Sequence, residues 1–234
     1  DACPAEFFAD FENGVLGISS VNTIPVTFTT KGIYRISGFF NELGQGAMTF
    51  DTISETVGCI SENSILQVPG GIVFAGNDGY YFTNAYDIFK LSKQFNTTYR
   101  SITTDAAGST QTTAKQKRIT GAYDPRTNRA WWGVQKTSTN TDNDACLILD
   151  LNFPLNPEKN CWTSASNSTH FNPAALLFMP QGTVCAEGDM LRAENKYILR
   201  HTSTESEDRY IDTTVAGADL KSKAIRIDFQ SMAY

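Results

Sequence analysis

The chain has few of the residues that most enzyme active sites use. Its 234 residues include only two histidines, His170 and His201. The sequence holds no H-E-x-x-H zinc motif, no G-x-S-x-G nucleophile elbow and no Walker-type phosphate loop. A glycosidase carboxylate pair cannot be identified from linear spacing, because 25 Asp and Glu residues form many accidental pairs. We therefore expect no enzymatic activity, no metal site and no cofactor.

Long apolar runs and an excess of basic residues are also missing. No run approaches the roughly 18 apolar residues of a membrane-spanning helix, so no membrane span is expected. Lys and Arg total 19 against 25 Asp and Glu, which gives a net charge of −6. This balance argues against a nucleic-acid-binding face. The hydrophobic content of 41% is sufficient for a sizeable core, which argues against a disordered chain.

The five cysteines lack the C-x-x-C spacing of common zinc sites. Their number is odd, and Cys behaves as a small hydrophobe, so we expect free and mostly buried thiols. Cys146 and Cys161 flank one expected hairpin and are the pair in which a disulfide would be sought. Two N-glycosylation sequons, at Asn96 and Asn167, carry little weight in a chain rich in Thr and Asn.

Short apolar or alternating runs separated by turn residues predict an all-β fold. Residues 71–76 form a compact apolar run, and Asn77-Asp78-Gly79 separates it from the aromatic run 80–82. Asp-Gly between apolar runs is a strong hairpin signal, because such turns need a positive φ. We therefore expect Asp78 and Gly79 to form a structural turn in which Gly79 has a positive φ.

A second hairpin is predicted over residues 119–134. Asp124 can accept hydrogen bonds from the following backbone, and Pro125 presets φ at the first corner of the turn. Asp124 and Pro125 are therefore expected to form a structural turn. Further strands are expected at residues 145–151, 174–179 and 196–201. The adjacent Trp131 and Trp132 must face opposite sides of their strand, one toward a core and the other toward a surface or a sheet interface.

Two polar segments and one periodic segment depart from this pattern. Residues 105–117 and 137–144 are rich in Thr, Asn, Gln and Asp, so we expect exposed and mobile loops. Residues 87–97 carry apolar side chains at roughly helical spacing. We expect one or two helical turns there.

A weak repeat suggests how the strands are organised. The run that begins at Gly32 recurs loosely at Gly79, 47 residues later, and an aromatic run follows at Arg129, 50 residues further on. A period of 40 to 50 residues with two hairpins in each unit is typical of β-propeller blades. We therefore expect about four antiparallel blades over residues 1–215, as part of an incomplete propeller or of a longer chain, with a further β element or terminal strand at 216–234.

The middle of the chain resembles the propeller of phage tail nozzle proteins, the tail tubular proteins of short-tailed phages. Residues 58–64 follow the family pattern G-C-V/I-S-x-x-S, and residues 71–82 and 90–92 resemble the hairpin and strand that come next. Residues 31–38 and 122–132 look like the neighbouring blades. The likeness covers roughly residues 30–135 and is weaker to about 200. The family's platform regions, which make ring and portal contacts, have no counterpart here, and 105–117 is an insertion.

The resemblance implies a structural virion protein located in the phage tail. Nozzles form a ring, typically of six copies, that contacts portal or adaptor proteins and tail fibres or spikes. Duplex DNA leaves through the ring without specific binding. An acidic wall fits that role, because a duplex carries one negative charge per about 1.7 Å. The alternative is a secreted glycan-binding β-propeller or carbohydrate-active protein, in which the three tryptophans near turns would stack on sugars.

Overall fold

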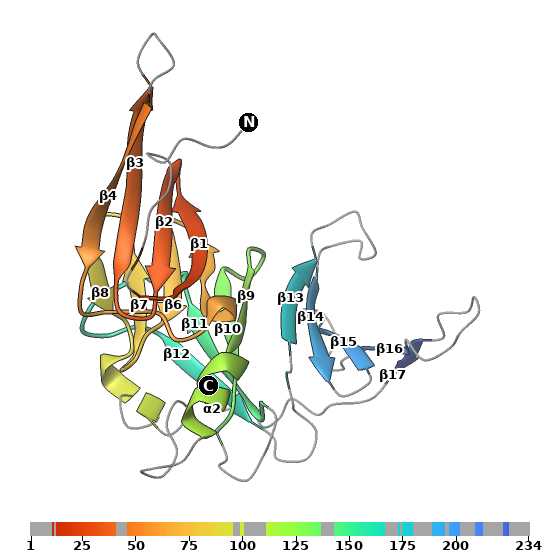
Figure 1. Cartoon of the computed structure of the whole chain (residues 1–234). Helices are drawn as coiled ribbons and strands as arrows, with labels where there is room; N and C mark the ends of the chain where they lie inside the picture. The colour runs from red at the N-terminus through yellow and green to blue at the C-terminus, as the bar shows by residue number, and fades with distance from the viewer. Residues whose placement is uncertain are drawn as a thin grey trace.

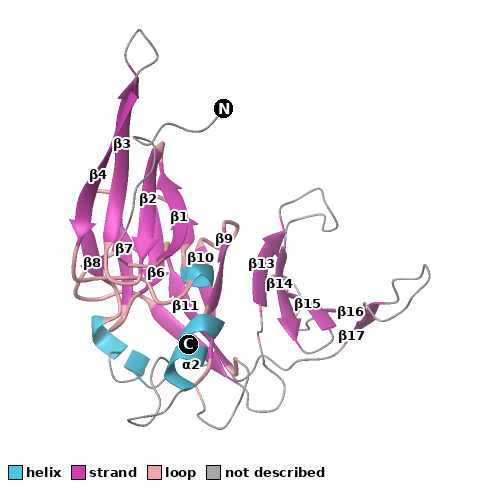
Figure 2. Ribbon diagram, in the orientation of Figure 1, coloured by secondary structure: helices cyan, strands magenta, loops and turns pink. Residues whose placement is uncertain are grey.

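The computed structural model describes most of the first two thirds of the chain and the strands of the last third. The described residues are 11, 13–40, 46–95, 99–100, 111–136, 143–166, 173, 175–179, 189–194, 197–201, 209–212 and 222–224. Strands dominate, and they form antiparallel sheets that follow one another along the chain (Figures 1 and 2). The all-β fold predicted from the sequence is confirmed. No helix among the described residues is long and apolar enough to cross a membrane.

The first sheet is a four-stranded meander in which each strand pairs with the next in the sequence. One face packs against the second sheet, and Val26, Phe28 and Ile33 on that face are fully buried. The long β3–β4 hairpin extends beyond the rest of the sheet (Figure 1). The strands are β1 (Val15–Val21), β2 (Ile24–Thr29), β3 (Ile33–Phe40) and β4 (Gly46–Ser54).

The second sheet is the most buried part of the described structure. Every residue of β6 and β7 is buried, because the sheet lies between the first and third sheets and packs against both. Its elements are η2 (Glu62–Ser64), β5 (Leu66–Val68), β6 (Gly71–Ala75), β7 (Tyr80–Thr83), β8 (Ile88–Lys90) and η3 (Lys93–Phe95).

The third and fourth sheets continue the meander. The third has four strands and the fourth five, all paired in chain order. The third sheet is preceded by a short helix, α2 (Gln111–Arg118). Its strands are β9 (Thr120–Asp124), β10 (Arg129–Val134), β11 (Ala145–Asp150) and β12 (Trp162–Ser166). Those of the fourth sheet are β13 (Ala175–Met179), β14 (Asp189–Glu194), β15 (Tyr197–His201), β16 (Arg209–Asp212) and β17 (Ser222–Ala224).

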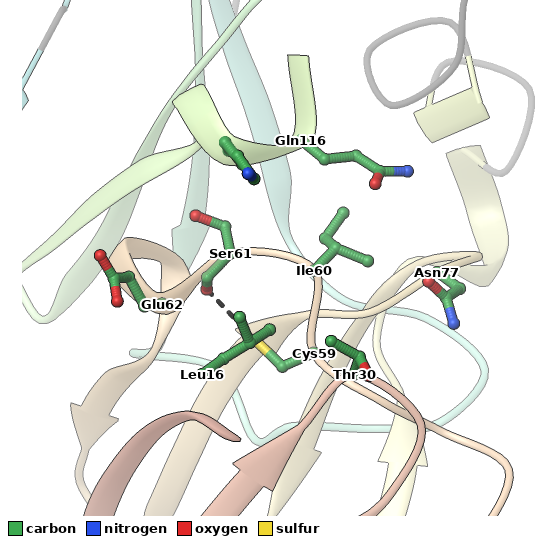
Figure 3. A pocket seen from close by; sticks show the side chains of 9 residues that line it. Leu16, Thr30, Cys59, Ile60, Ser61, Glu62, Asn77 and Gln116 are labelled. Carbon is green, nitrogen blue, oxygen red and sulfur yellow. Dashed lines mark hydrogen bonds between the residues drawn. The ribbon is translucent and has the colours of Figure 1, made fainter. Parts of the chain in front are cut away.

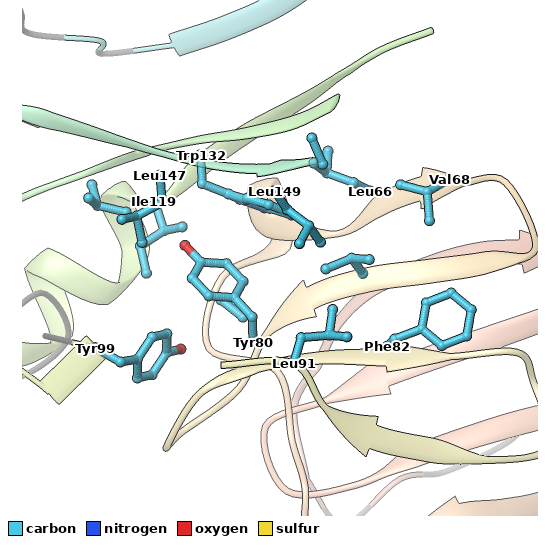
Figure 4. Packing of buried hydrophobic residues seen from close by; sticks show 14 of the residues in the cluster. Leu66, Val68, Tyr80, Phe82, Leu91, Tyr99, Ile119, Trp132, Leu147 and Leu149 are labelled. Atoms are coloured by element: carbon cyan, nitrogen blue, oxygen red, sulfur yellow. The ribbon is translucent and has the colours of Figure 1, made fainter. Parts of the chain in front are cut away.

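The four sheets stack face to face through three apolar clusters. The largest cluster joins the second and third sheets, and Tyr80, Tyr99 and Trp132 are fully buried at its centre (Figure 4). Trp131 points the other way, into the cluster between the third and fourth sheets. The two tryptophans therefore fill two different sheet interfaces, as expected for neighbours on one strand.

The first strand of each sheet contacts the first strand of the next sheet. Contacts join β1 to β5, β5 to β9 and β9 to β13. These strands begin at residues 15, 66, 120 and 175, so the structural unit repeats every fifty residues or slightly more. Consecutive four-stranded meanders joined along their first strands are blade-like. No sheet among the described strands closes on itself.

The expected repeat is in register for one step and out of register at the next. Ile33 and Tyr80 begin the third strands of the first two sheets, whereas Arg129 begins the second strand of the third sheet. Trp131 and Trp132 therefore lie in a second strand, whereas the residues with which the repeat aligns them lie in the third strands of the first two sheets. The division at residue 215 stays a prediction, since residues 213–221 and 225–234 lie outside the described part.

Three local expectations are corrected. Residues 88–90 are strand β8 rather than helix, because they pair with β7 through Thr83↔Ile88 and its neighbours. A 3₁₀ turn, Lys93–Phe95, follows in the part of this segment that the structure describes. Part of the expected loop 105–117 is helix α2, in which Lys115 is 2% exposed. In the second expected loop, Asn143 and Asp144 are buried. Residues 101–110 and 137–142, and both sequons, lie outside the described residues.

Candidate functional site

A pocket of about 430 Å³ lies where the first sheet, the second sheet and α2 meet (Figure 3). The side chains of Leu16, Cys59 and Ile60 give it an apolar part. Polar side chains from the link before η2, from the β6–β7 turn and from α2 surround that part. The lining residues are Leu16, Thr30, Cys59, Ile60, Ser61, Glu62, Asn77, Gln116 and Lys117.

The pocket is lined by the Cys59 thiol and by the hydroxyls of Ser61 and Thr30, and the first two of these groups are engaged in structural hydrogen bonds. The Cys59 thiol donates to the carbonyl oxygen of Ser61 at 3.1 Å. Burial raises the pKa of this thiol to about 11, so it stays protonated at neutral pH and is a poor nucleophile. The Ser61 hydroxyl donates to the carbonyl oxygen of Ile119 at 2.7 Å. The described residues of the pocket can line a small binding site, but they do not activate the Cys59 thiol or the Ser61 hydroxyl as a nucleophile.

The sequence-predicted residues Asp78 and Gly79 lie in the connection between β6 and β7, at one side of this pocket. The Gly76 N–H donates to the carbonyl oxygen of Gly79 at 2.8 Å, which closes the hairpin. Asp78 accepts hydrogen bonds from the Tyr81 hydroxyl at 2.5 Å and from the Lys90 ammonium at 3.0 Å. Partial burial opposes ionisation of Asp78, but these donors outweigh it and hold the pKa of the carboxyl below its ordinary value.

The reason expected for a glycine at position 79 is wrong. Its φ is not positive, and the described glycine with a positive φ is Gly70, at +82°. Gly79 is required by close packing instead. A Cβ atom there would lie 2.3 Å from Cε of Lys90 and 2.4 Å from Oγ of Ser92. The four-residue connection from Gly76 to Gly79 turns without the left-handed conformation that a two-residue Asp-Gly turn requires.

Asp124 and Pro125 lie at the β9–β10 turn of the third sheet and do not line the pocket. Asp124 is buried, and its carboxylate accepts from the Arg126 N–H at 2.9 Å and from the Thr127 hydroxyl at 3.0 Å. The same carboxylate pairs with the Arg126 guanidinium at 3.2 Å. That guanidinium lies over the Phe178 ring at 5.5 Å, so the turn contacts β13 of the fourth sheet.

The long β11–β12 connection holds a residue that sequence reasoning missed. The Asn160 amide is 7% exposed and donates to the carbonyl oxygen of Leu91 at 3.0 Å. Its backbone N–H donates to the Gln94 side chain at 3.1 Å. Trp162 also donates to the Leu91 carbonyl, at 3.2 Å. These bonds fasten the third sheet to the second. A Pro- and Asn-rich stretch signals only a loop, so the sequence carries no sign of this role.

The three tryptophans are part of the sheet packing. Trp131 and Trp132 are buried, and the partly buried Trp162 packs against Trp132 and Tyr80 with ring centroids 5.7 and 5.2 Å apart. Cys59, Cys146 and Cys161 form no disulfide; the first two are buried and the third is exposed. The described residues contain no group of three or more His, Cys, Asp or Glu side chains placed to hold a metal ion.

No protein-family model matches the sequence, and no curated protein is significantly similar to it.

Proposed function

We propose that this protein is a structural component of a phage tail, arranged as a ring of identical copies around the path of the genome. The observation that carries the proposal is the position of the residues that resemble the nozzle family. Residues 58–64 form the joint at which the first three sheets meet.

Gly58, Cys59, Ser61 and Ser64 of the motif each have an architectural contact. A Cβ on Gly58 would lie 2.1 Å from the carbonyl oxygen of Thr30, so only glycine fits against the first sheet. The Cys59 N–H donates to the Thr29 carbonyl at 2.9 Å. Ser61 bonds to Ile119 at the start of the third sheet. The motif therefore positions sheets, as expected in a protein whose role is mechanical.

The last residue of the motif, Ser64, makes contacts to two sheets. Its hydroxyl accepts from the Ala75 N–H of β6 at 3.1 Å. Its carbonyl oxygen accepts from the Trp132 indole of β10 at 3.1 Å. The buried polar groups of Ser64 are therefore engaged in hydrogen bonds between sheets and are not available for catalysis. The Cys59 thiol and the Ser61 hydroxyl of the adjacent pocket are also engaged, which favours a structural role over a catalytic one.

The proposal is tested on intact particles. Mass spectrometry of purified virions is expected to detect this chain, and a cryo-EM reconstruction of the tail is expected to place it in a symmetric ring below the portal. The proposal is wrong if the chain is absent from particles that contain the other tail proteins, or if it occupies a single asymmetric position.

A further inference from the structure

The link that leads into the first sheet carries the one Asn-Gly dipeptide of the sequence, Asn13-Gly14. It lies directly before β1 and outside the strand. Gly14 is exposed and Asn13 is half-buried, and nothing lies within 4 Å of a Cβ built on Gly14. The Asn13 side-chain amide makes no hydrogen bond with a described residue. Backbone and side chain therefore have room to change conformation at this dipeptide.

An asparagine followed by glycine combines an electrophile and a nucleophile that can react with each other. The electrophile is the side-chain carbonyl carbon of Asn13, and the nucleophile is the backbone nitrogen of Gly14, so their bond closes a five-membered ring. Asparagine is thermolabile in proteins. Glycine, which has no Cβ, readily adopts the backbone conformations that ring closure requires. Outside the strands the Gly14 N–H donates to no described carbonyl oxygen, so no such hydrogen bond has to break before the attack.

We propose that Asn13 is a site of spontaneous and irreversible deamidation in the folded protein. Hydroxide from the solvent removes the Gly14 N–H proton, and the nitrogen attacks Cγ of Asn13. The bond from Cγ to the side-chain nitrogen then breaks. That nitrogen takes a proton from water and leaves as ammonia, which regenerates the hydroxide and leaves a succinimide. Water opens this ring at either carbonyl carbon and gives aspartate or isoaspartate. In isoaspartate the main chain runs through Cβ and Cγ and is one atom longer.

The reaction falls beside the joint between the first and second sheets. The Gly14 carbonyl oxygen accepts from the Thr30 N–H at 3.1 Å. Thr30 and Leu16 line the pocket where these sheets meet (Figure 3), and a Cβ on Gly58 would lie 2.1 Å from the Thr30 carbonyl oxygen. An additional main-chain atom before Gly14 displaces the Gly14 carbonyl. Isoaspartate at position 13 therefore weakens the attachment of β1 at this joint.

The Asp78-Gly79 dipeptide has the same potential chemistry, with loss of water, but its surroundings oppose the reaction. Gly79 is buried, and a Cβ there would lie 2.3 Å from Cε of Lys90. The Asp78 carboxylate accepts from the Tyr81 hydroxyl and the Lys90 ammonium, which keep it ionised at neutral pH. An ionised carboxylate is a poor electrophile. Residue 78 therefore serves as an internal control for residue 13.

The first test follows the purified chain during storage at pH 6 and pH 8, with peptide mapping by mass spectrometry. We expect aspartate and isoaspartate to accumulate at position 13, faster at pH 8 because hydroxide starts the reaction, and no isoaspartate at position 78. G14A should slow the reaction at least about tenfold, because a Cβ restricts the backbone at the attacking nitrogen. The folded variant has open space for this Cβ. The inference is overturned if Asn13 stays intact in the folded chain while it deamidates in urea, or if G14A reacts at the same rate.

The second test concerns the consequence for the joint. N13D carries the new negative charge without the additional main-chain atom, so it is the matched control. Ion exchange separates the aged, more acidic chains from unmodified ones, and their thermal unfolding is compared with that of N13D. We expect the isoaspartate-containing fraction to melt at a lower temperature than N13D, which should melt like the unmodified chain. Equal melting temperatures of the aged fraction and N13D would show that position 13 does not affect the joint.

Discussion

Single side chains in this protein are constrained mainly by contacts with other strands. Gly79 is an example, because the atoms that exclude a Cβ belong to Lys90 and Ser92, eleven or more residues away. Cys59 is another, since its backbone N–H donates to the Thr29 carbonyl of the first sheet at 2.9 Å and its side chain is buried there. In both cases the residue type is explained by packing density rather than by the local conformation of the backbone.

Replacing Gly79 by alanine should lower the free energy of unfolding by about 1–3 kcal/mol. The added Cβ displaces the Lys90 side chain from Asp78, and it displaces the Ser92 hydroxyl that accepts from the Tyr80 N–H at 2.9 Å. Urea denaturation measures the effect. Gly14→Ala is the control, since nothing lies within 4 Å of a Cβ there. Equal stability of the two variants would contradict the packing explanation.

The buried Cys59 thiol predicts a loss of stability in alkaline solution. Its pKa is about 11 in the folded protein against 9.0 for a free thiol. Between these values the unfolded chain has lost a proton that the folded chain keeps, so the free energy of unfolding falls as the pH rises from about 9 to 11. Cys59→Ala should make this fall less steep in denaturation series at pH 8, 9 and 10. A slope identical to that of the unmodified chain would show that the thiol does not contribute.

At the scale of secondary-structure elements, connections join sheets as well as strands. The segment between β11 and β12 reaches the end of the second sheet, where Asn160 bonds to the Leu91 carbonyl. Lys93 and Glu158 form an exposed ion pair at 2.5 Å between the same two regions. These two contacts differ in burial, so they should differ in energetic weight.

Replacing Asn160 by alanine should cost about 1–3 kcal/mol of unfolding free energy, because it removes three hydrogen bonds of a buried amide, one to the Leu91 carbonyl and two with the Asn156 backbone. Lys93→Ala breaks the ion pair between the same regions and should cost less than about 1 kcal/mol. Thermal and urea unfolding of the two variants measure the difference. The expectation fails if the Lys93 variant is the less stable one.

At the scale of the whole molecule, four sheets are stacked in chain order and joined along their first strands. Each internal interface is apolar, and the two tryptophans of β10 occupy different interfaces. Such a stack has two ends, and both ends expose an apolar residue. The net charge of −6 is a property of the same scale, since it sets the average electrostatic field around the chain.

The isolated chain should not bind duplex DNA at physiological salt. With 25 acidic and 19 basic residues, the chain has no excess of cationic side chains. Such an excess drives duplex binding, because Lys and Arg that neutralise phosphates release the counterions condensed on the DNA. Fluorescence anisotropy of a labelled duplex should stay constant up to micromolar protein. Binding in that range that weakens as salt is added would reveal a basic surface and contradict an acidic wall around the genome path.

The local sequence was sufficient to predict most strands and hairpins, because turn residues and the alternation of apolar and polar side chains act over only a few residues. Asp124 accepts from the backbone of its own turn, and the apolar run at residues 145–151 correctly predicted strand β11. Tertiary structure decided the remainder. The segment with helical spacing at residues 88–90 became a strand because β7 was available to pair with it. Lys115 and Asn143, in segments that read as exposed loops, are buried because the third sheet and its neighbours enclose them. Which residues are enclosed depends on contacts between segments far apart in the chain, and these contacts leave no local pattern in the sequence.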